Sequence, residues 1–147
     1  MKKINTIPWE VIILTVILIL VFLPKNLSSR VNLDNLFQND LIIEVIHRNN
    51  LVESGTVTST TDVTKLEELE NFLDKYKSIP TIMSIKQLDD EESYTINFKN
   101  DDEFLTTIVL YKKNLEVMPG SDTVRRYSVI GENIDFNFLE QFVKSIN

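Results

Sequence analysis

Residues 93–130 read SYTINFKNDDEFLTTIVLYKKNLEVMPGSDTVRRYSVI, and the fold prediction starts from this stretch because short extended segments alternate in it with polar turns. Tyr94, Ile96 and Phe98 alternate with Thr95 and Asn97, which is typical of a strand with one face toward a core and one toward water. Turn-forming residues separate the segments at the short intervals expected of antiparallel neighbours. The sequence predicts an antiparallel meander with strands at about residues 81–88, 93–99, 103–111, 114–118 and 123–130.

Two further extended segments precede this meander. Residues 41–46 are rich in β-branched side chains, and Asn49-Asn50 follows as a turn. Residues 51–59, rich in Thr and Val, then predict the partner strand of a hairpin.

Amphipathic helices are predicted on both sides of the meander. The first has its apolar residues three and four positions apart and begins either at Thr64, in a capping box with Glu67, or at Asp62. The second begins near Asp135. The apolar positions are Leu66, Leu69, Phe72, Leu73 and Tyr76 in the first helix, and Phe138, Leu139, Phe142, Val143 and Ile146 in the second. We therefore predict a two-layer α+β fold. One layer is an antiparallel meander sheet, and the other consists of two helices packed on one face of that sheet.

The N-terminal segment differs from the rest of the chain. An uncharged apolar run of thirteen residues extends from Val11 to Leu23, and Ile7, Pro8, Trp9 and Glu10 precede it. A transmembrane helix needs about 20 apolar residues, so the run must use its flanks, and extension to Ile7 gives a span at the short end of the accepted range. Pro24 ends it. The sequence predicts a transmembrane helix that contacts the lipid bilayer through Ile7 to Leu23.

This reading divides the chain into a transmembrane anchor (residues 1–24), a stalk or linker (residues 25–40) and a soluble α+β domain (residues 41–147). Two alternatives stay open, a cleaved signal peptide with Lys2 and Lys3 as its basic region, and a buried helix of a soluble protein. If the helix is an uncleaved signal-anchor, the sequence predicts a single-pass protein of the cell membrane whose C-terminal domain is extracytoplasmic. The positive-inside rule alone gives only a small preference for that orientation.

The charges of the chain are distributed unevenly. Residues 1–30 carry +3 of the formal net charge of −7, because Lys2, Lys3, Lys25 and Arg30 outnumber Glu10, so residues 31–147 carry −10. An acidic domain of this kind repels phosphate backbones and anionic lipid headgroups, whose binding needs a basic stripe that the sequence does not show, and we expect no nucleic-acid partner. The chain has no cysteine, which excludes disulfides, thiolate zinc sites and the lipid-modified cysteine of a lipoprotein.

The sequence offers no catalytic, cofactor-binding or metal site. His47 is the single histidine, and no Gly-x-Ser-x-Gly elbow accompanies it, so we expect a structural or exposed role. The acidic runs at residues 89–92 and 100–103 lack the glycine and the terminal glutamate of an EF-hand loop and indicate solvated turns. We expect that the protein is not an enzyme and holds no cofactor.

Arg125, Arg126 and Tyr127 are the one candidate partner-binding group. They include the only pair of adjacent arginines in the acidic domain. On a strand the two arginines point to opposite faces, so at most one shares a face with Tyr127.

The segments FLTTIVLYKKNLEVMPG, RRYSVIG and FLEQFVKSI carry a resemblance. In plan the chain resembles small membrane-anchored extracytoplasmic domains of unknown function from Gram-positive bacteria, over most of residues 41–147. The resemblance implies an early hairpin, a short helix, a meander with an aromatic-rich last strand and a closing helix. It implies no activity.

Together these observations predict a membrane-anchored binding or interaction domain that contacts an unknown protein partner. The first alternative is a secreted inhibitor or effector that signal cleavage releases. A hydrolase, which needs a cleft lined by ionisable groups, is the alternative with the least support.

Overall fold

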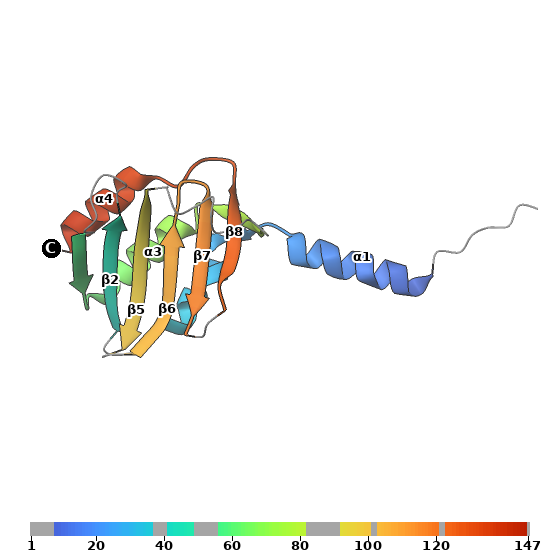
Figure 1. Cartoon of the computed structure of the whole chain (residues 1–147), viewed down its shortest axis with the longest axis horizontal. Helices are drawn as coiled ribbons and strands as arrows, with labels where there is room; N and C mark the ends of the chain where they lie inside the picture. Colours follow the sequence, from blue (N-terminus) through green and yellow to red (C-terminus); the bar gives the residue numbers. More distant parts are fainter. Residues whose placement is uncertain are drawn as a thin grey trace, which may run out of the picture.

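A computed structural model describes residues 8–36, 41–48, 56–81, 92–100, 103–120 and 123–146. In these residues an eight-stranded sheet has the order β1-β4-β8-β7-β6-β5-β2-β3, and every neighbouring pair is antiparallel (Figure 1). The strands are β1 (Lys25–Asn26), β2 (Leu41–Arg48), β3 (Thr56–Thr60), β4 (Lys77–Pro80), β5 (Ser93–Asn100), β6 (Glu103–Leu110), β7 (Asn114–Pro119) and β8 (Arg125–Ile130).

Strands β5 to β8 form the meander. They pair in sequence order, with Ile96 opposite Ile108 and Leu115 opposite Tyr127. Alternate side chains of these strands face the core, so Tyr94, which is 2% exposed, is buried in the same row as Ile96. The hairpin β2–β3 joins through β2, which pairs with β5, and β4 joins at the other side through β8.

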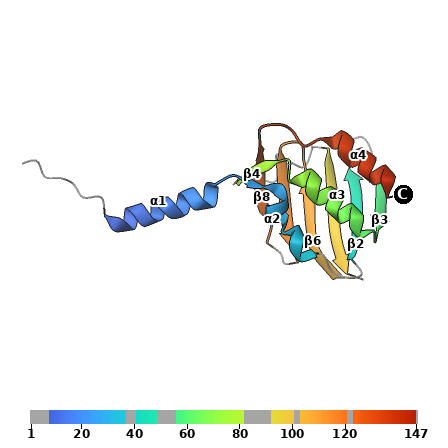
Figure 2. The same cartoon turned by 180° about the vertical axis from the view of Figure 1, so that it is seen from behind.

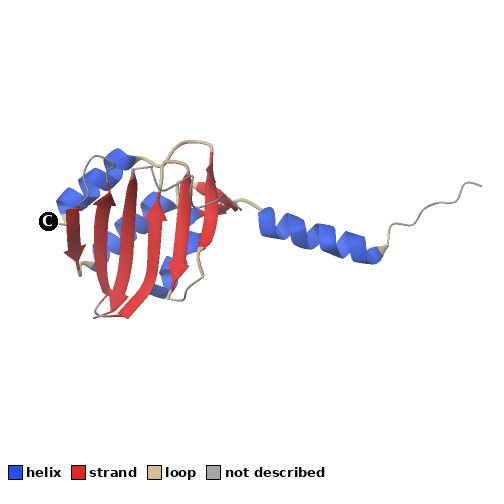
Figure 3. Ribbon diagram, viewed as in Figure 1, coloured by secondary structure: helices blue, strands red, loops and turns tan. Residues whose placement is uncertain are grey.

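Helices cover one face of this sheet. Figures 2 and 3 show α2 (Leu27–Val31), α3 (Val63–Leu73) and α4 (Phe136–Ser145) on the same side of the strands, and a short 3-10 helix, η1 (Leu33–Leu36), follows α2. Asp62 caps α3 by accepting a hydrogen bond from the Thr64 amide at 2.9 Å. Asp135 caps α4 by accepting from the Asn137 amide at 3.0 Å, as predicted.

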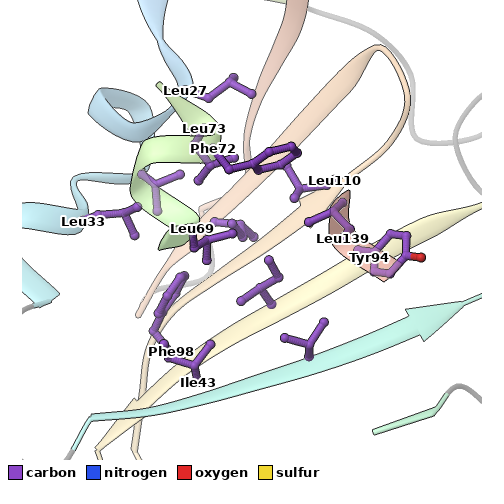
Figure 4. Packing of buried hydrophobic residues seen from close by; sticks show 14 of the residues in the cluster. Leu27, Leu33, Ile43, Leu69, Phe72, Leu73, Tyr94, Phe98, Leu110 and Leu139 are labelled. Atoms are coloured by element: carbon purple, nitrogen blue, oxygen red, sulfur yellow. The ribbon is translucent and has the colours of Figure 1, made fainter. Parts of the chain in front are cut away.

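The core lies between the helices and the sheet. Figure 4 shows Phe72 and Leu69 of α3, Leu139 of α4 and Leu27 of α2 gathered over strand residues such as Phe98. The opposite face of the sheet carries ion pairs, since Lys99 donates to Glu44 at 2.8 Å and Arg126 donates to Glu116 at 2.6 Å. Val109, Tyr111 and Met118 form a small apolar cluster there. The bond from Lys99 lowers the pKa of Glu44.

Helix α1 (Trp9–Phe22) lies outside the two layers and extends away from the domain (Figure 1). It begins after Pro8 and ends before Leu23, whose extended backbone is the conformation that a following proline imposes. Its 14 residues cover about 21 Å of the roughly 30 Å of a hydrocarbon core.

Within the described residues, no helix combines the length and the apolar character that a membrane span requires. The prediction of a transmembrane helix is therefore wrong. The physical reason is that α1, bounded by Pro8 and Pro24, is too short to span the hydrocarbon core. The descriptions of the chain as a signal-anchor and as a single-pass protein of the cell membrane with an extracytoplasmic domain depended on that span and are wrong with it.

The predicted fold class is also wrong as stated. The structure has four α-helices in its described part instead of a membrane helix and two domain helices, and its sheet contains more than the meander and one hairpin. Residues 25–36, expected as a stalk, form β1, α2 and η1, and they contribute the buried side chains of Leu27, Val31, Leu33 and Leu36. The strand predicted at residues 81–88 falls outside the described residues from residue 82 onward, whereas β4 ends at Pro80.

Candidate functional site

The surface of α1 is apolar on every side. From Val11 to Leu23 its large apolar side chains are between 45% and 58% exposed, and no residue of the helix is buried. The hydroxyl of Thr15 donates to the carbonyl of Val11 at 2.7 Å and so presents little polarity of its own. A helix that exposes apolar groups all round needs an apolar environment on all sides, unlike an amphipathic surface helix.

Arg30 joins the end of α1 to the domain. Its Nη2 donates to the Leu23 carbonyl and to the Ser78 carbonyl, both at 3.2 Å. Its guanidinium carbon lies 4.8 Å from the centre of the Tyr127 ring. The Nε of Arg30 is buried and has no hydrogen-bond partner in the described part of the chain.

A groove of about 610 Å³ opens beside this junction, and we call it the α1 groove. One wall is apolar and comes from the last turns of α1, and the other comes from β1, β4 and the start of β8. Its lining residues are Ile17, Leu20, Val21, Lys25, Arg30, Pro80, Thr81, Val124, Arg125, Arg126 and Tyr127.

The three predicted partner-binding residues all line the α1 groove. Arg125 stands opposite Val117 and Tyr127 opposite Leu115, so both are on the helix-covered side of β8. Arg126 is on the other side of the strand, where Glu116 neutralises it. Arg125 and Tyr127 therefore share one face of β8, and Arg126 reaches the lining of the groove from the opposite face.

A second and larger depression of about 830 Å³ lies where β2 and β5 approach the start of α4, and we call it the His47 pocket. Its lining residues are His47, Tyr76, Glu92, Tyr94, Lys112, Glu132, Asn133, Ile134, Asp135, Phe136, Asn137 and Glu140. Strand pairing creates it, because the register of β2 and β5 places His47 opposite Tyr94.

Ring stacking and ion pairs order the His47 pocket. The His47 and Tyr94 rings stack with centroids 4.3 Å apart, and Phe136 meets Tyr94 edge-on at 5.0 Å. The Nε2 of His47 lies 3.1 Å from Oε1 of Glu92, and Nζ of Lys112 lies 3.5 Å from the other oxygen. The Tyr76 hydroxyl accepts a hydrogen bond from the Asp135 amide at 2.9 Å.

Carboxylates dominate the electrostatics of the His47 pocket. Glu92, Glu132, Asp135 and Glu140 line it against Lys112 and His47. Burial raises the pKa of Tyr94 to about 12, and the charges of Glu92 and Glu140 add to the effect. The hydrogen bond from Lys144 lowers the pKa of Glu140.

The described lining of the His47 pocket combines aromatic rings with charged side chains. Within the part of the chain that the structure describes, the lining of this pocket contains no serine, threonine or cysteine beside His47. Among the described residues no group of three or more His, Cys, Asp or Glu side chains is arranged to hold a metal ion. Aromatic faces beside several carboxylates are suited to an ammonium or guanidinium group.

Sequence reasoning missed the composition of the His47 pocket. Glu92 belongs to an acidic run that indicated only a turn, and Tyr94 was assigned to the core by its alternation. Lys112 lies between the strands predicted at residues 103–111 and 114–118, where the sequence indicates only a turn of the meander. The pairing of β2 with β5 brings Glu92 and Tyr94 next to His47. The register of that pairing does not follow from a single sequence.

Comparison of the chain with protein-family models, with curated proteins and with solved structures gives no match.

Proposed function

We propose that this protein is a binding protein that contacts lipid through α1 and presents an α+β domain to a protein partner. The proposal concerns contact with lipid and not a crossing of the bilayer. The observation that carries it is the exposure of α1, whose apolar side chains are about half exposed on every side.

Lipid covers the apolar surface of α1 more completely than a groove on another protein would. A groove covers one face of a helix, so a helix that docks in one usually keeps a polar face toward water. Helix α1 has no such face, since Glu10 in its first turn is its single charged residue. Trp9 at the same end is 67% exposed and suits the level of lipid headgroups.

Flotation of the full-length protein with neutral phosphatidylcholine vesicles tests the proposal. The parent should float, and Ile17→Asp should weaken partition on the order of one hundredfold, because an aspartate in place of an isoleucine costs about 3 kcal/mol in the middle of an apolar helix. Val57→Asp is the matched control, since Val57 is 57% exposed on β3, away from α1. A parent that stays in the aqueous fraction, or an Ile17→Asp variant that floats equally well, contradicts lipid contact.

For the domain we propose binding instead of catalysis, with a cationic group of the protein partner in the His47 pocket. The excess of carboxylates over Lys112 and His47, next to the rings of Tyr94 and Phe136, supports this choice. The acidity of residues 31–147 supports the further proposal that nucleic acid is not a partner.

Calorimetric titration of the full-length protein in detergent with a short arginine-containing peptide tests the His47 pocket. Replacing the carboxylates in Glu132→Gln and Glu140→Gln should weaken binding up to about fivefold each, as expected for exposed charges. Glu103→Gln, an exposed change on β6, is the control. An acidic peptide that binds as well as the basic one would show that the pocket does not select cations.

A further inference from the structure

The α1 groove collects positive charge in an otherwise acidic molecule. Lys25, Arg30, Arg125 and Arg126 line it, and they are four of the fifteen lysines and arginines in a chain of net charge −7. No aspartate or glutamate is among the described residues that line the groove.

These four cations differ in how far the protein already neutralises them. Glu116 pairs with Arg126, and the carbonyls of Leu23 and Ser78 take hydrogen bonds from Arg30. Lys25 and Arg125 are exposed, and neither has an ion pair within the part of the chain that the structure describes. Two uncompensated charges therefore lie beside a third, Arg30, that the Tyr127 ring and the backbone hold in place.

The position of these charges relative to α1 indicates the kind of ligand. Ile17, Leu20 and Val21 recur at helical spacing and form the apolar wall, while Lys25 follows the helix end at Phe22 by three residues. A molecule that satisfies both walls has a hydrocarbon part along α1 and an anionic part at Lys25 and Arg125. An anionic phospholipid has this combination, because its phosphate lies at the boundary of the hydrocarbon.

We propose that the α1 groove binds the phosphate of an anionic lipid headgroup through Lys25 and Arg125, with Arg30 fixing the angle between α1 and the domain. The inference rests on the lipid contact proposed above for α1 and adds the lipid class. Arginine and lysine both suit phosphate, arginine as a two-pronged donor and lysine as a point charge. A second copy of the chain offers acidic residues to these cations, and self-association is therefore the competing outcome of the test.

The experiment compares full-length protein on vesicles of phosphatidylcholine alone and of phosphatidylcholine with phosphatidylglycerol. The parent should bind the anionic vesicles more tightly, and added salt should remove the difference. Each basic residue near an anionic surface contributes about fivefold, so the double variant Lys25→Gln/Arg125→Gln should lose about twenty-five-fold on anionic vesicles and little on neutral ones. Lys113→Gln, an exposed change in the β6–β7 turn, should lose much less on either.

The outcomes separate this inference from the proposal on which it rests. Binding to both vesicle types without preference, or a double variant equal to Lys113→Gln, overturns the lipid class while lipid contact by α1 stands. Failure to bind either vesicle overturns lipid contact itself. Inorganic phosphate that binds without vesicles and is lost in the double variant would assign the groove to a free anion, and concentration-dependent self-association that the double variant abolishes would assign it to a second copy. Circular dichroism melts of both variants, which should match the parent, exclude unfolding as the cause.

Discussion

Tyr94 combines a buried ring with carboxylates nearby, and burial raises its pKa to about 12 from about 10. Between these values an unfolded chain loses the tyrosine proton while the folded chain keeps it. The unfolded state then binds fewer protons, so the free energy of unfolding falls as pH rises from about 10 to 12, and the contribution is complete below pH 10.

Denaturant melts of the parent and of Tyr94→Phe at about pH 9 and pH 11 measure this contribution. The phenylalanine keeps the ring beside His47 and removes the ionising hydroxyl. We expect the parent to lose more stability over this interval than the variant, whose remaining pH dependence reports the other titrating groups. Equal losses would mean that Tyr94 ionises normally in the folded protein.

Leu27 shows how one residue outside any apolar run reaches the core. It is 0% exposed, its amide donates to the Tyr76 carbonyl at 3.0 Å, and it packs in the cluster beneath α3. Leu27→Ala should lower the free energy of unfolding by about 2–5 kcal/mol, because truncation leaves a cavity. Ser29→Ala, two residues further and exposed, should change it by less than about 0.5 kcal/mol in the same urea melts. A small loss in Leu27→Ala would place residues 25–36 outside the cooperative core.

Among the elements, α4 provides the clearest agreement between periodicity and packing. Leu139, Phe142 and Val143 are buried, and Phe138 stacks on Phe72 of α3 with ring centroids 4.1 Å apart. Phe142→Ala should therefore cost about 3–5 kcal/mol, a large part of the roughly 5–15 kcal/mol that stabilises a small domain.

The matched change on the outer face of α4 is Lys144→Ala. Lys144 pairs with Glu140 at 2.7 Å, but both side chains are more than half exposed, so this variant should lose less than about 0.5 kcal/mol. Urea melts of the two variants decide whether α4 belongs to the core. If Phe142→Ala unfolds at the same urea concentration as the parent, α4 is peripheral and its apolar stripe becomes a surface.

The elements that could be predicted from the sequence are those with a repeated local pattern. The alternation of Tyr94, Ile96 and Phe98 marks β5, and the spacing of Leu66, Leu69 and Phe72 marks α3. The sequence does not decide where α3 starts, because Thr64 and Asp62 are both good N-cap residues. In the structure Asp62 is the cap, and the amide and hydroxyl of Thr64 both donate to its carboxylate. Local patterns thus suffice where each turn of a helix or each pair of strand residues repeats the signal.

Short elements and sites lack that repetition. Strand β1 has two residues and α2 has five, too few for any period to show, so Leu27 resembled an isolated leucine in a linker. The His47 pocket depends on the pairing of β2 with β5 and on the arrival of α4, which are contacts between distant parts of the chain. Arg125 and Tyr127 could be named from the sequence, but their contact with Arg30 required the packing of β1 and β4 against β8.

At the scale of the whole molecule, charge and hydrophobicity are separated along one direction. Helix α1 extends from the side of the domain where β4 and β8 lie, and β2 and α4 lie further from it (Figure 2). The cations of the α1 groove line the junction with α1, whereas residues of β2 and α4 line the acidic His47 pocket. An anionic surface at α1 would attract the cations that line the α1 groove and repel the acidic remainder of the domain. This arrangement favours an orientation in which the His47 pocket stays away from the surface and open to a partner.

The boundary between α1 and the domain gives the last prediction, which two truncated proteins test. A chain that begins at Pro24 lacks residues 1–23, and from the described part of the chain it loses α1, which has no buried residue, and the hydrogen bond from Arg30 to the Leu23 carbonyl. It should keep the parent's stability to within about 1 kcal/mol, the typical net contribution of one hydrogen bond.

A chain that begins at Ser29 also loses β1 and Leu27, and with Ser28 it loses a hydrogen bond to Asp74. The loss of a buried leucine alone costs about 2–5 kcal/mol, and the edge of β4 then has no partner strand. We expect this shorter chain to unfold at a clearly lower urea concentration than the first. Signal cleavage after about residue 28 would release a secreted chain that begins at this point. Equal stability of the two truncated proteins would be compatible with such release, whereas the expected difference argues against it.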